Sequence, residues 1–247
     1  MDGSAARNRS SWARLEPACV EAAMVLISEH QAGLLRAHFE RALESPVRID
    51  LFVEPERRLF RAADECEWCD EALELMTELA RLSPKLELVV HTLSAEAETA
   101  RRLGVERVPA IVLSGAARGS VRFVGMPLGY ELTEMLETIV DISRGHADLD
   151  AETKTALASL KGEVRLELFV TQSCPHCPSM ARLIHKLAIE SGRVSADVIE
   201  AGQHPGLVER YAIEGVPTLV VNGEVALVGL QPEAHLLVDA IRAARAR

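Results

Sequence analysis

The stretch RLELFVTQSCPHCP, residues 165–178, decides the fold. It opens with alternating polar and apolar side chains, which predicts a β-strand with two different faces. A Cys-x-x-Cys motif, Cys174 and Cys177, follows the strand. The next apolar residues recur at helical spacing and predict a helix: Met180, Leu183, Ile184, Leu187 and Ala188. The stretch therefore predicts a strand and a helix with a dithiol at their junction.

The same pattern occurs earlier in the chain. The run RIDLFV at residues 48–53 matches RLELFV, and it precedes a second Cys-x-x-Cys motif, Cys66 and Cys69. Each half also has a Val-Pro pair, with the prolines at Pro109 and Pro217. The interval from the first cysteine to this proline is 43 positions in both halves (109 − 66 and 217 − 174). Shared landmarks at a shared interval indicate a duplicated unit.

Hydrophobic periodicity predicts one order of elements in both halves: strand, Cys-x-x-Cys helix, strand, helix, two hairpin strands and a closing helix. In the first half we predict strands over 48–53, 86–90, 111–113 and 121–124, and helices up to 82, over 95–103 and over 130–142. In the second half we predict strands over 163–170, 194–199, 218–221 and 225–228, and helices over 180–188, 207–211 and 236–241.

Three local signals complete this prediction. Asn222-Gly223 favours a two-residue hairpin turn between the last two strands. Ser28 and Gln31 match a capping box that would open a helix ending near Leu43. A further helix is expected over 151–160, leading into the second unit. The order of elements is that of the thioredoxin fold. We therefore predict an α/β protein with tandem thioredoxin folds, each a mixed central sheet flanked by helices.

The polar stretch 143–148 marks the expected boundary between the units. We assign 24–145 to an N-terminal thioredoxin-like unit and 146–247 to a C-terminal thioredoxin-like, or glutaredoxin-like, unit. Residues 1–23 match neither unit and are expected to be a disordered extension or a mis-assigned start. In the second case the chain would begin at Met24, and the single Cys19 would be absent.

Composition narrows the classes of function. The 247 residues carry a formal net charge of -10, which argues against a nucleic-acid groove or an anionic membrane surface as the main partner. No apolar run approaches the ~20 residues of a membrane helix. Residues 1–19 are polar and do not resemble a signal peptide. We therefore expect a cytoplasmic protein, in which paired cysteines are more often catalytic or metal-binding than structural.

A Cys-x-x-Cys motif at the start of a helix suits thiol–disulfide chemistry. The attacking group is a thiolate, which an ordinary cysteine with a pKa of about 8.5 supplies sparingly at neutral pH. The helix N-terminus favours the anion, and one turn brings the second thiol within reach. We assign Cys174 as the nucleophile and Cys177 as the resolving thiol. Pro175 suits the first helical turn, and a protonated His176 would further stabilise the thiolate.

The first dithiol has a more acidic setting. Five carboxylates surround it: Asp64, Glu65, Glu67, Asp70 and Glu71. Like charge disfavours a thiolate, so Cys66 should be the weaker nucleophile. Cys66 and Cys69 form either a slower second redox pair or a degenerate copy retained for packing or substrate binding. Trp68 is expected to pack beside this pair or to line a substrate groove.

The chain resembles the glutaredoxin-like protein disulfide oxidoreductases, which have two thioredoxin folds in one polypeptide. The matching landmarks in the first half are Leu26-Ile27-Ser28, Cys66-x-x-Cys69, Val108-Pro109, Gly125-x-Pro127-x-Gly129-x-Glu131 and Ile139-Val140-Asp141-x-Ser143-Arg144. Those in the second half are Phe169-Val170-Thr171, Cys174-Pro175-x-Cys177-Pro178, His185-Lys186-Leu187-Ala188, Val198-x-Glu200-Ala201 and Val216-Pro217.

The resemblance implies dithiol–disulfide exchange with protein disulfides, by reduction, oxidation or isomerisation. It also implies recycling by a flavoprotein reductase of thioredoxin-reductase type, with no cofactor in this chain. In the thioredoxin fold the Val-Pro bond is cis and lies against the dithiol, so Pro109 and Pro217 are expected to be cis.

The chain departs from related patterns at two places. Residues 53–64 lengthen the approach to Cys66 and could reshape the first site. Thioredoxin has a buried acid six positions before its first cysteine, but that position is Leu168 in this chain. Glu167 is one residue away and should point to the other face of the strand. Proton transfer at Cys174 and Cys177 is therefore expected to be glutaredoxin-like.

Three other interpretations stand beside the general oxidoreductase. A zinc site is disfavoured because each pair offers only two ligands and the pairs occupy equivalent places in a repeat. The chain could be an electron donor dedicated to one partner, such as a peroxidase. It could also be a thioredoxin-fold binding module with incidental cysteines, an interpretation that the Cys174-Pro175-His176-Cys177 motif disfavours.

Overall fold

The structure is a computed structural model that describes residues 26–54 and 66–230, together with Val238 and Ile241. The expected extension 1–23, Cys19 and most of the closing helix lie outside these residues, as does most of the lengthened segment before Cys66.

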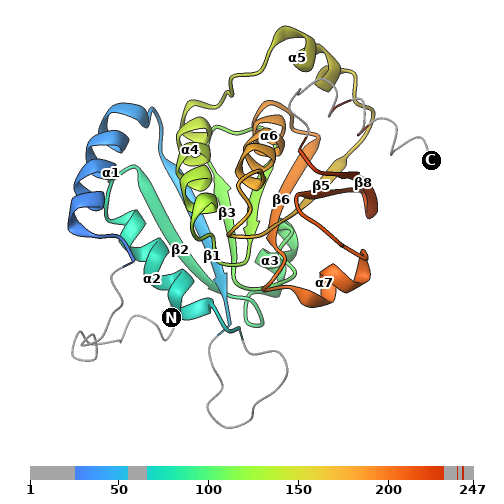
Figure 1. Ribbon diagram of the computed structural model, residues 1–247. Coiled ribbons are helices and arrows are strands. Elements are labelled where there is room, and N and C mark those ends of the chain that lie inside the picture. Colours follow the sequence, from blue (N-terminus) through green and yellow to red (C-terminus); the bar gives the residue numbers. More distant parts are fainter. Residues whose placement is uncertain (1–25, 55–65, 231–237, 239–240, 242–247) are drawn as a thin grey trace, which may run out of the picture.

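Eight strands form one continuous sheet in the order β2-β1-β3-β4-β6-β5-β7-β8 (Figure 1). The strands are β1 Val47–Val53, β2 Leu86–Thr92, β3 Ala110–Ser114, β4 Ser120–Val124, β5 Val164–Val170, β6 Val194–Glu200, β7 Thr218–Val221 and β8 Glu224–Val228. Each half pairs its first two strands in parallel and adds two antiparallel hairpin strands. The two halves are joined where β4 pairs in parallel with β6.

Helices cover both faces of this sheet. They are α1 Glu29–Ala42, α2 Cys69–Ala80, α3 Ala97–Leu103, α4 Tyr130–Arg144, α5 Ala151–Ala158, α6 Cys177–Glu190 and α7 Pro205–Arg210. Helices α1, α2, α4 and α6 contribute to the largest apolar core, whereas α3 and α7 pack on smaller clusters on the other face (Figure 1). Strand β1 serves both faces, because Leu51 packs in the large core and Phe52 packs with α3. The order and layers of the elements confirm the predicted fold class of tandem thioredoxin folds.

The local signals in the sequence form the expected contacts. Ser28 and Gln31 make the reciprocal hydrogen bonds of a capping box at the start of α1. Asn222 and Gly223 both have positive φ, 50° and 89°, as the hairpin between β7 and β8 requires. Within the polar stretch 143–148, Gly145 ends α4 in the left-handed conformation. Among the described residues, no helix is long and apolar enough to cross a membrane.

Helices α4 and α6 lie side by side on one face of the sheet, although they belong to different halves of the chain (Figure 1). On the opposite side of the β4–β6 junction, the buried guanidinium of Arg122 pairs with the buried carboxylate of Asp197 at 2.5 Å. Arg165 reaches the same carboxylate at 3.2 Å. The two sequence repeats therefore share both a sheet and a core.

Candidate redox site

The dithiol of the second half lies at the carboxyl end of β5. Cys174 is half-buried in the turn before α6, and its backbone N–H donates to the carbonyl of Thr171 at 3.1 Å. Cys177 is the first residue of α6 and is fully buried. Both thiols are free. The sulfur of Cys174 is therefore accessible to a substrate, whereas that of Cys177 is buried.

Burial sets the acid–base behaviour of the inner thiol. Burial, followed by the hydrogen bond with Cys174, raises the pKa of Cys177 to about 12. A thiol with this pKa is protonated at neutral pH. Its reaction therefore requires a nearby group that accepts the proton.

The start of α6 differs from the sequence expectation. We expected Pro175 in the first helical turn, but Pro175 is exposed in the turn before the helix, and Pro178 occupies the first turn instead. His176 is the exposed N-cap residue, and its side chain caps no backbone group. The reason is that the Cys174–Cys177 segment closes as a turn, so helical hydrogen bonding begins later than the motif suggests.

Both Val-Pro peptide bonds have the predicted isomer, and one of them lies at the second dithiol. The Val108–Pro109 and Val216–Pro217 peptide bonds are both cis. The carbonyl oxygen of Val216 lies 3.9 Å from the Sγ atom of Cys174. The segment before Pro217 therefore lies directly against the outer thiol.

A buried carboxyl group in α4, which the sequence analysis missed, acts electrostatically on the inner thiol. Glu131 is the second residue of α4, is only 2% exposed, and belongs to the first half of the chain. Its charge adds to the raised pKa of Cys177, after burial and the hydrogen bond with Cys174. Burial, followed by the nearby carboxylates of Glu200 and Glu134, raises the pKa of Glu131 to about 8. We expected no acid from the strand before Cys174 to serve this site, and Glu131 is a buried acid that comes from the other repeat.

One signal in the sequence could have identified this acid. Glu131, Glu134 and Thr138 recur at spacings of three and four on the same helical stripe as buried apolar residues of α4. Polar residues on an apolar stripe indicate buried groups that need partners. Glu134 has them, because its Oε1 atom accepts from Thr138 at 2.6 Å and contacts the ring of His185 at 2.9 Å. The Oε1 atom of Glu131 has no partner among the described residues.

The acid that precedes Cys174 in sequence takes no part in this site. Glu167 is buried on the opposite face of the sheet, where Arg165 pairs with it at 3.3 Å and the hydroxyl of Tyr211 donates to it at 3.2 Å. The predicted orientation of Glu167 is therefore confirmed, and Leu168 takes the core-facing position above α6.

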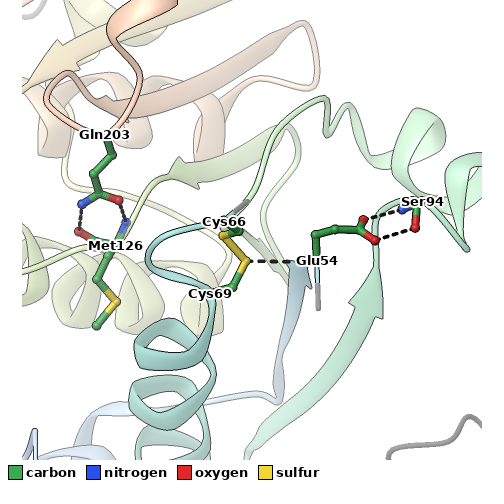
Figure 2. Close-up of a disulfide and its surroundings, with 6 residues drawn as sticks. All are labelled: Glu54, Cys66, Cys69, Ser94, Met126 and Gln203. Carbon is green, nitrogen blue, oxygen red and sulfur yellow. Dashed lines mark hydrogen bonds between the residues drawn. A yellow bond between two sulfur atoms is a disulfide. The ribbon is translucent and has the colours of Figure 1, made fainter. Parts of the chain in front are cut away.

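The first dithiol is oxidised. Cys66 and Cys69 form a disulfide of 2.08 Å, and the backbone N–H of Glu54 donates to the Sγ atom of Cys69 at 3.3 Å (Figure 2). Cys69 is buried and Cys66 is half-buried, so this pair repeats the inner and outer arrangement of the second site. Trp68 is exposed along part of its surface and packs against the core with the rest.

The carboxylates around the first pair are mostly solvated. Asp70 is exposed and Glu71 is half-buried, while Asp64 and Glu65 lie outside the described residues. Exposed charges are screened by water and salt, which weakens their effect on a nearby thiol. The described residues contain no cluster of three or more side chains that could hold a metal ion.

Comparison with protein families supports these observations. The thioredoxin domain model matches residues 164–242. Thioredoxin from Methanocaldococcus jannaschii is 37% identical over 81 residues, which cover 32% of this chain and 94% of that protein. The alkyl hydroperoxide reductase AhpF from Xanthomonas campestris pv. phaseoli is 26% identical over 192 residues, 77% of this chain and 32% of that protein. The chain thus spans about a third of the length of this AhpF relative.

Solved structures match both halves together. A protein disulfide oxidoreductase from Aeropyrum pernix k1 aligns with a TM-score of 0.77 and 29% identity over 89% of this chain and 94% of that one. The NTD_N/C domain of alkylhydroperoxide reductase AhpF from Enterococcus faecalis (V583) aligns with a TM-score of 0.74 over 87% of this chain and 99% of that one. The second match has 22% identity and shows the fold alone.

Proposed function

The chain belongs to the thioredoxin family, and from this premise we propose that it is a thiol–disulfide oxidoreductase acting on protein disulfides. The observation that carries the proposal is the free pair Cys174 and Cys177, with its outer thiol partly accessible and its inner thiol buried. The likeness to a solved protein disulfide oxidoreductase over both halves supports protein substrates.

In the proposed reduction, the thiolate of Cys174 attacks one sulfur of the substrate disulfide. A Cys174–substrate disulfide forms, the substrate S–S bond breaks, and one substrate thiolate leaves. Deprotonated Cys177 then attacks the Sγ atom of Cys174. The Cys174–Cys177 disulfide forms and the second substrate thiolate leaves, so two electrons pass from the protein to the substrate. Oxidation of a substrate dithiol is the reverse sequence.

We assign Glu131 as the acid–base group of this exchange. Its carboxylate accepts the proton of Cys177 during reduction, and its protonated form returns a proton to Cys177 during oxidation. A group with a pKa of about 8 is present in both forms near neutral pH, which suits it to either direction.

We also propose roles for the other parts of the molecule. Cys66 and Cys69 are a slower second redox pair, and 24–145 and 146–247 are the two units. Pro217 and Pro109 shape the substrate side of each site, and a flavoprotein reductase of thioredoxin-reductase type reduces the protein again. A cytoplasmic location suits the free thiols of the second site.

A second function is favoured by one observation. Much of the chain is similar to part of the alkyl hydroperoxide reductase AhpF, in sequence and in fold. This similarity suits an electron donor dedicated to one partner, such as a peroxidase. Narrow specificity, with no turnover of generic disulfides, would distinguish it from the general oxidoreductase.

Reduction of insulin by dithiothreitol, catalysed by the wild type and three variants, tests the proposal. We expect Cys174→Ser to abolish catalysis, and Glu131→Gln to lower the rate about 100-fold, the typical contribution of one acid–base group. Cys66→Ser should keep most of the activity and is the matched control. An inactive wild type would contradict the general function and favour the dedicated donor.

A further inference from the structure

The inner sulfur of the first dithiol receives a hydrogen bond from the end of β1 (Figure 2). The donor is the backbone N–H of Glu54, which lies 3.3 Å from the Sγ atom of Cys69. The carbonyl of Val53 belongs to the same peptide group, and it accepts the backbone N–H of Leu93 at 3.0 Å. Because a peptide group is planar, this second bond helps to fix the direction in which the Glu54 N–H points.

The side chain of Glu54 holds the same segment a second time. Its Oε2 atom accepts the backbone N–H of Ser94 at 2.9 Å, and its Oε1 atom accepts the Ser94 hydroxyl at 2.6 Å (Figure 2). We call these two bonds the Glu54–Ser94 clamp. Ser94 lies in a turn that is itself hydrogen-bonded, because the carbonyl of Thr92 accepts the backbone N–H groups of Ala95 and Glu96 at 3.2 and 2.9 Å. The clamp therefore ties the residue that carries the donor to a fixed turn.

The second half of the chain repeats the donor but not the clamp. Thr171 follows the last residue of β5 as Glu54 follows that of β1, and the backbone of Thr171 makes a hydrogen bond with Cys177. Ser94 is the second residue after β2, whereas the second residue after β6 is Gly202. A glycine has no hydroxyl to donate, so the same clamp cannot form there. The two dithiols thus differ in how firmly the donor to the inner sulfur is held.

Reduction of the first disulfide places a negative charge on this inner sulfur. A thiolate of a dithiol reductant attacks the Sγ atom of Cys66, the Cys66–Cys69 bond breaks, and Cys69 leaves as a thiolate. The second thiolate of the reductant then attacks its partner sulfur and releases Cys66, so two electrons pass to the protein and the reductant becomes a disulfide. The two protons of the reductant pass to solvent. An N–H donor stabilises a thiolate more than a neutral disulfide sulfur, because the acceptor is charged.

We propose that Ser94 is a positioning residue of the first redox site, which through the Glu54–Ser94 clamp holds the Glu54 N–H against Cys69 and makes the Cys66–Cys69 disulfide easier to reduce. The proposal rests on the proposed function, because it takes these two cysteines as a redox pair, and it deepens that function. It also gives Glu54 an effect opposite to that of a carboxylate that acts only by its charge. Such a carboxylate, for example the exposed Glu67, disfavours a nearby thiolate.

The test is the redox equilibrium of each dithiol in the full-length protein, in mixtures of reduced and oxidised dithiothreitol. Alkylation of the free thiols and mass spectrometry of the peptides give the reduced fraction of each pair separately. Glu54→Ala removes both bonds of the clamp and keeps the backbone N–H. We expect it to make the first pair about fivefold harder to reduce, the effect of one typical hydrogen bond. Ser94→Ala removes the hydroxyl bond alone and should act in the same direction, by less.

Two controls separate the clamp from charge and from general damage to the fold. Glu67→Ala removes an exposed carboxylate next to Cys66 without touching the clamp, so the first pair should be no harder to reduce than in the wild type. The Cys174–Cys177 pair of the same molecules should keep its equilibrium within about twofold in every variant. The proposal is overturned if Glu54→Ala leaves the first pair within about twofold of wild type, makes it easier to reduce, or shifts both pairs alike.

This measurement is independent of the insulin assay, because dithiothreitol is the only reaction partner. A first pair that becomes harder to reduce, in a protein that does not reduce insulin, would retain the clamp and reject the proposed function. An unchanged first pair in a protein that does reduce insulin would reject the clamp and retain the function.

Discussion

Burial changes the chemistry of single residues at the dithiol site. Cys177 and Glu131 are both nearly inaccessible, and burial raises the pKa of each group because the charged form loses its hydration. Cys177 is therefore protonated at neutral pH, and a large part of Glu131 is protonated as well. The outer thiol of Cys174 keeps contact with solvent and is available to a partner.

The raised pKa of Glu131 predicts a pH-dependent stability. A group whose pKa is higher in the folded state stabilises the fold below its unfolded pKa of 4.5, and this contribution is lost as the pH rises toward about 8. The free energy of unfolding should therefore fall across this window, by up to about 1.4 kcal/mol per pH unit. Urea unfolding at several pH values measures it. Glu131→Gln should flatten the slope, and an unchanged slope in that variant would contradict the assignment.

The different exposure of the thiols predicts an order of alkylation. In the reduced protein at pH 7, iodoacetamide should label the buried Cys177 and Cys69 least, because only an accessible thiolate reacts. Of the two half-buried thiols, Cys174 should react before Cys66, because the acidic residues around Cys66 disfavour its thiolate. Mass spectrometry of peptides after short exposures measures the order. Faster labelling of Cys66 than of Cys174 would reverse our ranking of the two sites.

At the scale of elements, the segment between β4 and α4 positions the acid. Gly125 donates its backbone N–H to the carbonyl of Pro109 at 2.8 Å, and Gln203 holds the next residue, Met126. The segment thus touches the proline loop of the first site at one end and delivers Glu131 to the second site at the other. The loop between β4 and α4 therefore helps to position Glu131, the proposed acid–base group.

This geometry predicts a cost for enlarging the glycine. Gly125→Ala should destabilise the protein by about 1–3 kcal/mol, because the left-handed backbone and the close contact with Glu200 both oppose a side chain. Gly206→Ala in α7 is the matched control, since nothing lies within 4 Å of a Cβ at that position, and it should be neutral or stabilising. Urea midpoints measure both. Equal stabilities of the two variants would show that the close approach is unimportant.

At the scale of the whole molecule, the two repeats form one continuous structure. Strand β4 pairs with β6, α4 packs on α6, and Arg122 of the first half is buried against Asp197 of the second. The arrangement explains how an acid from one repeat reaches the dithiol of the other. It also makes the ion pair at the junction a determinant of stability.

Removing one partner of that pair tests this view. Asp197→Ala should cost about 3–5 kcal/mol in the free energy of unfolding, because it leaves the buried guanidinium of Arg122 without its carboxylate. Glu106→Ala removes an exposed carboxylate that also pairs with Arg165, and it should cost less than about 1 kcal/mol. Chemical denaturation measures both changes. A loss below about 1 kcal/mol for Asp197→Ala would mean that the junction is held by packing alone.

The sequence by itself determined the repeat, the order of the elements and the positions of both dithiols. These features follow from periodicity and from spacing along the chain, which are local properties. The predicted cis bonds at Pro109 and Pro217, the capping box at Ser28 and the hairpin at Asn222 were all confirmed. The place of Pro175 was wrong, because the turn at the cysteines delays the helical hydrogen bonds of α6.

Only the tertiary structure decided which groups surround the inner thiol. Glu131 and Cys177 are 46 positions apart (177 − 131), and Glu131 acts on the thiol because the sheet continues from β4 to β6 and sets α4 against α6. In the sequence, Glu131 is simply an acid in the first turn of a helix, where such residues are common. Burial and the nearby carboxylate of Glu200 give it a different protonation, and both depend on distances that no local pattern contains.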